Sequence, residues 1–266
     1  MNILEAIKQR RSVRSYNGRG LTPEEIDQLK GAIAGSYSPF GGDVTIRLNS
    51  FELKGEYRPG TYGVIRGASD YFLLAYSDDE ESVLSAGFRF EQVVLQATAM
   101  GLGTCWIGGT FRGSDFDKGQ VWPDGEKLKI VSPVGEAAGK SLRESLTRFV
   151  MRSQNRKPFQ SLFFKGDFST GLNQDDGFGE PLEMMRLAPS SVNSQPWRAL
   201  VTDHTVHFYY LRKSGLSLLD SAIGMSHFFE TERYNGHRGD FFKEVNPPVA
   251  PKGWHYIRSY RRENII

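Results

Sequence analysis

Strand patterns and helix patterns alternate along this chain, and that order limits the folds that it can adopt. Residues 43–51 alternate apolar and polar side chains, as a half-buried strand does, whereas the nearly continuous apolar run at 71–77 predicts a central strand. Further strands are expected at 127–135, 198–201, 205–211 and 254–260. Because strands and helices are intermixed, we predict an α+β or α/β layered fold around a mixed sheet.

The expected helices have recognisable starts and stops. Thr22 with Glu25 three residues later forms a capping box, which predicts a helix that ends near Gly35. A longer amphipathic helix is expected over 80–100, and others at 3–9, 142–150, 181–187 and 218–234. Residues 152–181 fit neither pattern, but their phenylalanines predict a packed crossover and not a disordered linker.

Composition restricts the class of protein. The 266 residues are 39% hydrophobic and 24% charged, enough for one large domain or two small ones. A formal net charge of +2 provides no overall field for nucleic acid or an anionic membrane, so neither is expected as a partner. The single Cys105 excludes an internal disulfide, and five histidines without ligand spacing predict no metal site. With no signal-peptide pattern and no membrane-length apolar run, a cytoplasmic protein is expected.

Two segments 154 residues apart are weakly alike. Residues 32–48 and 186–202 each have the pattern of a helix end, a loop of small residues and a strand. An internal repeat explains the likeness, and so does the general similarity of helix–loop–strand units. If the halves are related, each has kept a different part of one site, because the basic run 10–12 and the polar loop 193–197 occur once each.

The basic run RRSVR follows the first expected helix. In an extended segment Arg10, Ser12 and Arg14 would point to one side, where guanidinium groups and a hydroxyl suit phosphate oxygens. The alternative is a solvated basic helix end that complements the helix dipole.

The segment GLGTCWIGG, residues 101–109, follows the long helix. Gly101 and Gly103 have the pattern of a helix stop, while Gly108 and Gly109 would let backbone N–H groups approach a flat ligand. Its spacing is not that of a dinucleotide fingerprint. Cys105 is expected to be buried and inert, because no histidine lies near it in the sequence.

Residues 187–201 gather short polar side chains between two prolines. Ser190, Ser191, Asn193 and Gln195 precede Trp197 and a strand, a combination that a plain surface turn does not require. The loop therefore predicts contact with a planar, polar ligand.

Together, the segments RRSVRSY, GLGTCWIGG, QNRKPF and APSSVNSQPW resemble the FMN-dependent nitroreductase family. Ordinary members carry the first and last motifs in one N-terminal stretch and complete their flavin sites between two subunits. Here about 180 residues separate these motifs. The resemblance thus implies a nitroreductase-like α+β fold with mostly antiparallel sheets, in which two related halves of one chain form an internal pseudo-dimer. The halves would be residues 1–155 and 181–266, joined by a crossover at 156–180.

The resemblance also implies FMN as the cofactor, with the flavin ring and no catalytic side chain carrying out the redox chemistry. The residues expected to bind it are Arg10, Arg11, Ser12, Arg14, Trp106, Ile107, Gly108, Gly109, Arg156, Pro189, Ser190, Ser191 and Asn193. NADPH or NADH would donate electrons to a small electron-poor acceptor, nitroaromatic or quinone-like, in a ping-pong cycle with one flavin per chain. An internal pseudo-dimer favours a monomer, with a homodimer as the alternative.

Other interpretations stay open. Relatives often carry lysine where this chain has Val13 or Arg14, and again where it has Gln154, which changes the expected phosphate contacts. The chain could be a specialised flavin enzyme of dehalogenase or azoline-oxidase type, or a flavin-binding protein without catalysis. A phosphate-binding regulatory domain is a more distant alternative.

Overall fold

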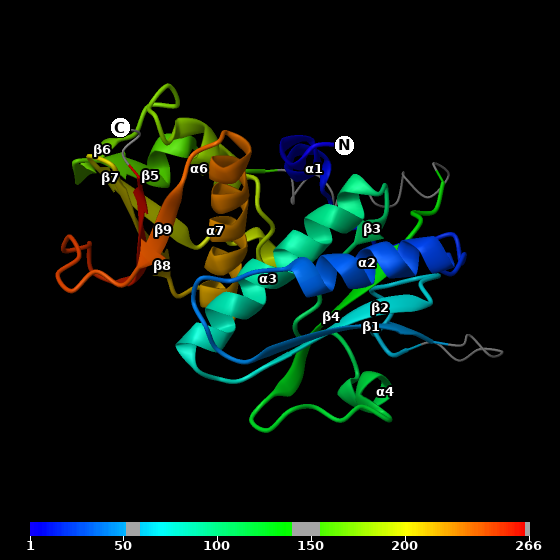
Figure 1. Cartoon of the computed structure of the whole chain (residues 1–266). Coiled ribbons are helices and arrows are strands. Elements are labelled where there is room, and N and C mark those ends of the chain that lie inside the picture. The colour runs from blue at the N-terminus through cyan, green and yellow to red at the C-terminus, as the bar shows by residue number, and fades with distance from the viewer. Residues whose placement is uncertain (52–58, 140–154, 264–266) are drawn as a thin grey trace. The chain divides into compact units, whose positions relative to one another are not determined.

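The computed structural model describes residues 1–51, 59–139 and 155–263 (Figure 1). The chain divides into two compact units, Met1–Val150 and Met151–Ile266, each built around its own sheet. The helix expected at 142–150 lies outside the described residues. In the part of the chain that is described, no helix is long and apolar enough to cross a membrane.

The first unit holds a four-stranded antiparallel sheet in the order β1-β2-β4-β3. Its elements are α1 Ile3–Gln9, α2 Pro23–Gly35, β1 Val44–Ser50, β2 Asp70–Tyr76, α3 Glu80–Ala99, β3 Gly103–Thr104, α4 Gly113–Asp117 and β4 Lys127–Gly135. β2 lies between β1 and β4 and is buried along its whole length, which confirms the central strand expected from its apolar run. α2 and α3 pack against β1 and against each other, and α3 also contacts β2 (Figure 1).

The helix boundaries follow the sequence signals. Thr22 Oγ1 accepts a hydrogen bond from Glu25 N at 3.2 Å, and Glu25 Oε2 accepts one from Thr22 N at 2.8 Å, so the capping box is confirmed. α3 ends at Ala99, and Gly101 follows in the left-handed region with φ +82°.

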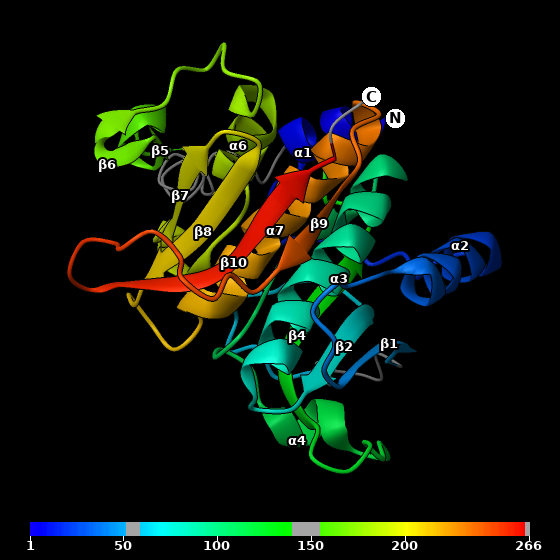
Figure 2. The same ribbon diagram turned by 60° about the vertical axis from the view of Figure 1, so that its left-hand side comes forward.

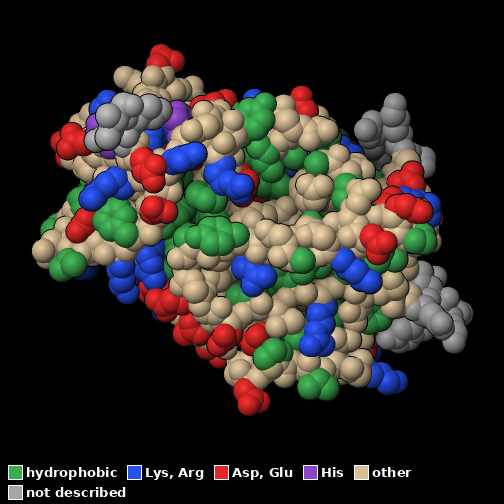
Figure 3. All heavy atoms as spheres, viewed as in Figure 1, with side chains coloured by type: hydrophobic (Ala, Val, Ile, Leu, Met, Phe, Trp, Pro, Cys, Tyr) green, Lys and Arg blue, Asp and Glu red, His purple; other side chains and the backbone are tan. Residues whose placement is uncertain are grey.

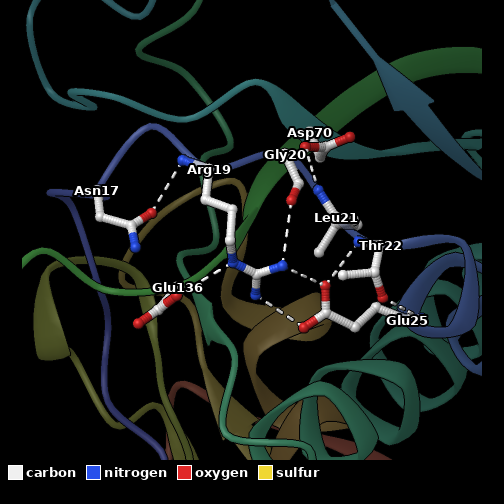
Figure 4. Close-up of polar contacts among 8 residues, drawn as sticks. All are labelled: Asn17, Arg19, Gly20, Leu21, Thr22, Glu25, Asp70 and Glu136. Atoms are coloured by element: carbon white, nitrogen blue, oxygen red, sulfur yellow. Dashed lines mark hydrogen bonds and ion pairs between the residues drawn. The ribbon is translucent and has the colours of Figure 1, made fainter.

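Arg19 fixes the path of the chain between α1 and α2 (Figure 4). Its two terminal nitrogens donate to the Glu25 carboxylate at 2.9 and 2.8 Å, and its Nε donates to Glu136 at 3.1 Å. The hydrogen bonds from Arg19 lower the pKa of Glu25. Because Arg19 is partly exposed, the network adds little stability by itself, but it joins the N-terminal segment to both α2 and the end of β4.

The basic segment is extended, as predicted, and it lies between two neighbouring backbone segments. On one side Val13 N donates to Thr104 O of β3 at 2.8 Å, and on the other Tyr16 N donates to Arg66 O at 2.8 Å. Gly67 allows the second contact, since its φ is +76° and a Cβ there would lie 2.3 Å from Tyr16 O. The fold thus places residues 12–16 by backbone pairing.

The close approach at Gly67 gives a testable consequence. Gly18 also has a left-handed φ, +87°, but a Cβ there would meet open space. We expect Gly18→Ala to lower the free energy of unfolding by about 1 kcal/mol. Gly67→Ala should lower it by about 3 kcal/mol, because a clash with backbone is added to the same conformational cost. Urea denaturation of the two variants measures the difference, and equal losses would contradict the steric explanation.

The second unit holds a six-stranded sheet in the order β6-β5-β7-β8-β10-β9. Its elements are η2 Phe159–Ser161, β5 Phe163–Lys165, β6 Asp167–Gly171, α6 Gly179–Arg186, η3 Ser191–Asn193, β7 Trp197–Thr202, β8 Thr205–Leu211, α7 Ser217–Tyr234, β9 Gly239–Phe242 and β10 Trp254–Arg262. The prediction of an irregular stretch at 152–181 is wrong at β5 and β6. These strands of three and five residues are too short to show an alternating pattern.

Trp197 anchors the core of this second unit. It is fully buried at the start of β7 and stands opposite Tyr210 of β8 in the sheet register. Gly224 of α7 lies against it, because a Cβ at this position would be 3.5 Å from the Trp197 ring and 3.1 Å from Met185. The absent side chain therefore lets α7 approach both α6 and the sheet, behind β8 and β10 in the view of Figure 2.

The two units share one topology. Each has a helix, two antiparallel strands, a long helix and then two further strands. The order β7-β8-β10-β9 repeats the order β1-β2-β4-β3, and every neighbouring pair is antiparallel. β5 and β6 extend the second sheet beyond β7, with β5 parallel to β7. The shared order favours an internal repeat over a chance likeness of the two segments.

The surface carries both signs of charge. Figure 3 shows Lys and Arg side chains among Asp and Glu side chains over the face that it draws. This distribution agrees with the small formal net charge of the sequence.

Candidate functional site

The first unit brings the two predicted motifs of the first half together. Ser12 pairs with Thr104, which places Ser12 and Arg14 close to Cys105. Burial raises the pKa of the Cys105 thiol, while the Arg14 cation and a hydrogen bond with Ser12 lower it to a smaller extent. The thiol is therefore protonated at neutral pH and is a core side chain, as expected.

Gly103 has a different role from the predicted one. Only Gly101 ends the helix, whereas a Cβ at Gly103 would lie 2.7 Å from the side chain of Val13. The glycine lets the basic segment lie directly on β3. Tight packing, and not chain reversal, explains the second glycine of GLGTC.

Arg10 is buried and pairs with a carboxylate of the same unit. Its side chain is 6% exposed, and its Nε lies 3.8 Å from Oε1 of Glu91, which is fully buried on α3. Trp106 Nε1 donates to the other oxygen of Glu91 at 2.8 Å. Burial lowers the pKa of Arg10, and the Glu91 charge partly offsets that effect. The predicted role of Arg10 in phosphate binding thus competes with this internal ion pair, whereas Arg11 is exposed.

We expect Glu91→Gln to destabilise the protein by about 3 kcal/mol, because a buried guanidinium loses its counter-charge. The glutamine keeps the volume and an acceptor for Trp106, so the change isolates the charge. Glu136→Gln is the control, since this carboxylate is half-exposed and its pair with Arg19 is worth at most about 1 kcal/mol. Urea denaturation followed by circular dichroism measures both, and a loss at Glu91 no larger than at Glu136 would refute the assigned role.

Ile107 is not a backbone donor to a ligand. Its N–H donates to Val131 O and its carbonyl accepts from Val131 N, both at 3.0 Å, so its predicted contact with a flavin ring is unavailable to the backbone. Gly108 and Gly109 are exposed, and within the described chain neither N–H donates a hydrogen bond. A Cβ at Gly109 would meet open space. The N–H groups of the glycine pair therefore stay exposed, and their role as donors to a ligand remains a prediction.

The second unit joins the predicted late arginine to the predicted loop. Arg156 Nη1 donates to Asn193 Oδ1 at 2.7 Å, and Arg156 Nη2 donates to Leu187 O at 2.8 Å. Asn193 Nδ2 in turn donates to the carbonyl of Asn155 at 2.8 Å. The side-chain amide of Asn193 thus connects residues 155–156 to the loop 189–196.

The buried side chain of Gln195 adds further hydrogen bonds between the loop and residues 155–157. It is 2% exposed, and its Oε1 accepts from Lys157 N at 2.8 Å while its Nε2 donates to Asn155 O at 3.1 Å. Lys157 Nζ donates to Ser194 O and Gln195 O at 2.6 and 3.2 Å. The amides of the loop therefore serve first to hold the loop against residues 155–157.

A cavity of about 460 Å³ opens where these two segments meet. It is lined by Asn155, Arg156, Lys157, Val192, Asn193 and Gln195. Two cationic side chains and no carboxylate line it, which suits an anionic group. Its volume is within the usual range for small-molecule sites of roughly 300–1,000 Å³.

The loop is strained at the rim of this cavity. Val192, Asn193 and Gln195 have φ values of +46°, +55° and +47°. A β-branched residue in the left-handed region is a conformational outlier, and the side chain of Val192 is 93% exposed, so packing does not compensate.

The strain at Val192 can be measured. We expect Val192→Gly to raise the free energy of unfolding by about 1 kcal/mol, because glycine adopts positive φ without a steric penalty. Val249→Gly is the matched control, since Val249 is 94% exposed and does not have a positive φ. Urea denaturation that showed equal effects for both variants would contradict the strain.

Asp220 lies behind the loop, on the first turn of α7. It is 3% exposed, and both of its carboxylate oxygens accept from Ser191 N at 3.0 Å. Burial raises the pKa of Asp220 to about 7, and the Ser191 N–H lowers it to a smaller extent.

Glu91, Lys157 and Asp220 are the polar residues that sequence reasoning missed. The sequence carries a signal for two of them: Glu91 is three residues from Phe88 and Val94 on the inward face of its helix, and Asp220 is three residues from Ile223. An acidic residue within an apolar helix face indicates a buried carboxylate. Lys157 offers no comparable pattern.

Comparison with known families places the chain. The model of the family described as "Putative TM nitroreductase" matches residues 2–231, so the chain belongs to this family. The nitroreductase-like α+β fold expected from the motifs is confirmed. No curated protein matches the chain.

Solved structures give similar folds. A crystal structure of a Thermotoga maritima protein described as a "putative nitroreductase" is 21% identical, with a TM-score of 0.63 over 98% of this chain and 93% of that one. A nitroreductase with bound FMN from Bacteroides fragilis is 19% identical, with a TM-score of 0.44 over 54% of this chain and 93% of that one. A nitroreductase with bound FMN from Desulfitobacterium hafniense is 17% identical, with a TM-score of 0.43 over 53% and 92%.

Proposed function

We propose that this protein is an FMN-dependent oxidoreductase of the nitroreductase type. It takes electrons from NADPH or NADH and passes them to a small electron-poor acceptor, nitroaromatic or quinone-like, in a ping-pong cycle. The observation that carries the proposal is the cation-lined cavity where QNRKPF and PSSVNSQPW meet, in a chain of this family. The protein acts in the cytoplasm as a monomer.

The donor set suits FMN. Arg156 lines a cavity without carboxylates and is assigned to the phosphate. Ser194 Oγ, next to Asn193, is buried without a hydrogen-bond partner among the described residues, as is common where a ligand or water completes a site. Pro189, Ser190, Ser191 and Asn193 are assigned to the polar edge of the flavin. These residues therefore fit an anionic, hydrogen-bonding cofactor.

The first unit supplies the remaining contacts in this proposal. Arg10, Arg11, Ser12 and Arg14 are assigned to the phosphate and the pyrimidine side, and Trp106, Gly108 and Gly109 to the ring; Ile107 contributes its side chain only. One FMN per chain follows from the single copy of each motif.

Bound FMN supplies reversible two-electron chemistry, so no side chain of the protein needs to act as nucleophile or general base. The protein's own groups bind and orient the cofactor. Cationic side chains favour the negative charge that reduction adds to the ring, and the Gly108 and Gly109 amides supply donors that need no reorganisation.

We expect the purified protein to bind one FMN per chain, and Arg156→Gln to raise the FMN dissociation constant at least about tenfold, since a hydrogen bond to a charged group is lost. The same variant should reduce the preference for FMN over riboflavin, which lacks the phosphate. Arg233→Gln is the control, because Arg233 is 61% exposed and its pair with Glu230 lies within its own helix. Flavin fluorescence titration gives both the affinity and the stoichiometry.

Two results would count against the proposal. Wild-type affinity in Arg156→Gln would remove the phosphate assignment, and two FMN per chain would contradict the proposed stoichiometry. Anaerobic addition of NADPH or NADH then separates an enzyme from a flavin-binding protein without catalysis. Only in an enzyme would the nicotinamide reduce the flavin and bleach the absorbance of its oxidised form, at roughly 450 nm.

A further inference from the structure

Asp220 makes an unusual contact with the loop that is assigned to the flavin. A single N–H, that of Ser191, lies 3.0 Å from both carboxylate oxygens. Such a two-oxygen contact suits the ionised form, because a protonated carboxyl group would turn its O–H toward the N–H or lose one acceptor. The side chain is nevertheless buried at 3% exposure, where a charge is costly.

The first unit holds its own loop through a different group. Asp43 N, directly before β1, donates to Ser82 Oγ of α3 at 2.8 Å, and this hydroxyl donates in turn to the Asp79 carboxylate at 2.7 Å. Ser82 is in the first turn of α3, as Asp220 is in the first turn of α7. In the first unit a hydroxyl therefore stands between the loop and a carboxylate, whereas in the unit that carries the PSSVNSQPW loop the buried carboxylate binds the loop backbone directly.

The Ser191 contact anchors the first part of the loop, and residues 155–157 hold its later part. Ser191 O accepts from Ser194 N at 3.0 Å, and the neighbouring Ser190 accepts at its carbonyl from Asn193 N and at its hydroxyl from Gln195 N, each at 3.0 Å. The left-handed turn from Val192 to Gln195 is thus closed onto the residue that Asp220 holds. Release of Ser191 would free a strained segment to relax.

We propose that Asp220 is a positioning residue for the cofactor, and that its ionised carboxylate holds the loop 190–195 in the conformation that binds FMN. The flavin part of this inference rests on the proposed function. Cofactor binding and ionisation of Asp220 then favour each other, so FMN binds more tightly above neutral pH than below it.

The surroundings leave Asp220 to titrate alone. The charged or titratable groups on α7 and on the elements around it are Glu180, Glu183 and Arg186 of α6, Arg198 of β7, His207, Tyr209 and Tyr210 of β8, Asp240 of β9, His255, Tyr256, Arg258, Tyr260, Arg261 and Arg262 of β10, Arg212 and Lys213 before α7, and His227, Glu230, Glu232, Arg233 and Tyr234 of α7 itself. Among the described residues, none of these shifts the pKa of Asp220, which reflects burial and the Ser191 N–H.

The test uses the full chain and Asp220→Asn, with Asp175→Asn as the control because Asp175 is exposed. Asparagine would place an NH₂ group beside the Ser191 N–H in place of one oxygen. We do not expect the substitution to impair folding, because it removes a buried charge. The pKa of Asp220 is raised from 3.8 to about 7 in the folded protein, so its charge lowers stability as pH rises through that interval. The variant should be at least as stable as the wild type at pH 8, which is roughly one unit above the pKa of Asp220.

Two measurements are compared. Without FMN, hydrogen exchange at pH 8 should be faster across residues 191–195 in Asp220→Asn than in the wild type and the control. With FMN, the dissociation constant should fall about fivefold more from pH 6 to pH 8 in the wild type than in Asp220→Asn, the size of one charge-assisted hydrogen bond. Comparing the proteins removes the titration of the FMN phosphate itself, whose second pKa is about 6.

Each outcome decides a separate point. Unchanged exchange in Asp220→Asn would overturn the positioning role, whether or not FMN binds. Faster exchange with the same pH profile as the wild type would overturn the coupling to the cofactor. If the wild type binds no FMN at either pH, the proposed function fails, and the exchange experiment still decides whether Asp220 holds the loop.

Discussion

Burying a carboxylate costs free energy, so each buried acidic side chain of this protein needs a partner that compensates its charge. The long helices carry buried acidic side chains, Glu91 on α3 and Asp220 and Glu232 on α7, and of these Glu91 and Asp220 contact segments of the candidate site. Glu91 has a cation and an indole N–H as partners, so its charge is compensated. Asp220 has one backbone N–H, so its charge is compensated in part. The first arrangement pairs two buried charges, and the second adds a carboxylate contact to a loop that residues 155–157 also hold.

The shared topology explains how one chain can contain both arrangements. With the same strand order and the same long helix in each unit, the core of one can be maintained while loops of the other change. The basic segment and its glycine-lined neighbour belong to the first unit, and the polar loop with its partner segment 155–157 belongs to the second. This division follows the distribution of motifs in the sequence, where each occurs once, and it is why the chain is proposed to use one cofactor although the scaffold is repeated.

Local signals in the sequence were sufficient for the main elements. The capping box at Thr22, the apolar run of β2 and the stop at Gly101 report short-range physics, and the structure confirms all three. β5 and β6 were missed because both are short and because β5 pairs with β7, more than 30 residues away. The backbone of Ile107 was misassigned for the same reason, since its partner Val131 lies on another strand. Motif likeness found the polar loop, but only the fold reveals that Asn193 and Gln195 bond to residues 155–157 first.

The two loops at equivalent places show where the protein departs from its most stable form. In the loop before β1 the residues with positive φ are Gly41 and Gly42, and hydroxyl groups of α3 bind the backbone. In the loop before β7 such φ values fall on Val192, Asn193 and Gln195, and a buried carboxylate binds the backbone. Glycine would adopt the positive φ values of the second loop at lower cost. Strained non-glycine residues and a buried carboxylate, gathered beside a cation-lined cavity, favour a segment shaped by binding over one shaped by folding alone.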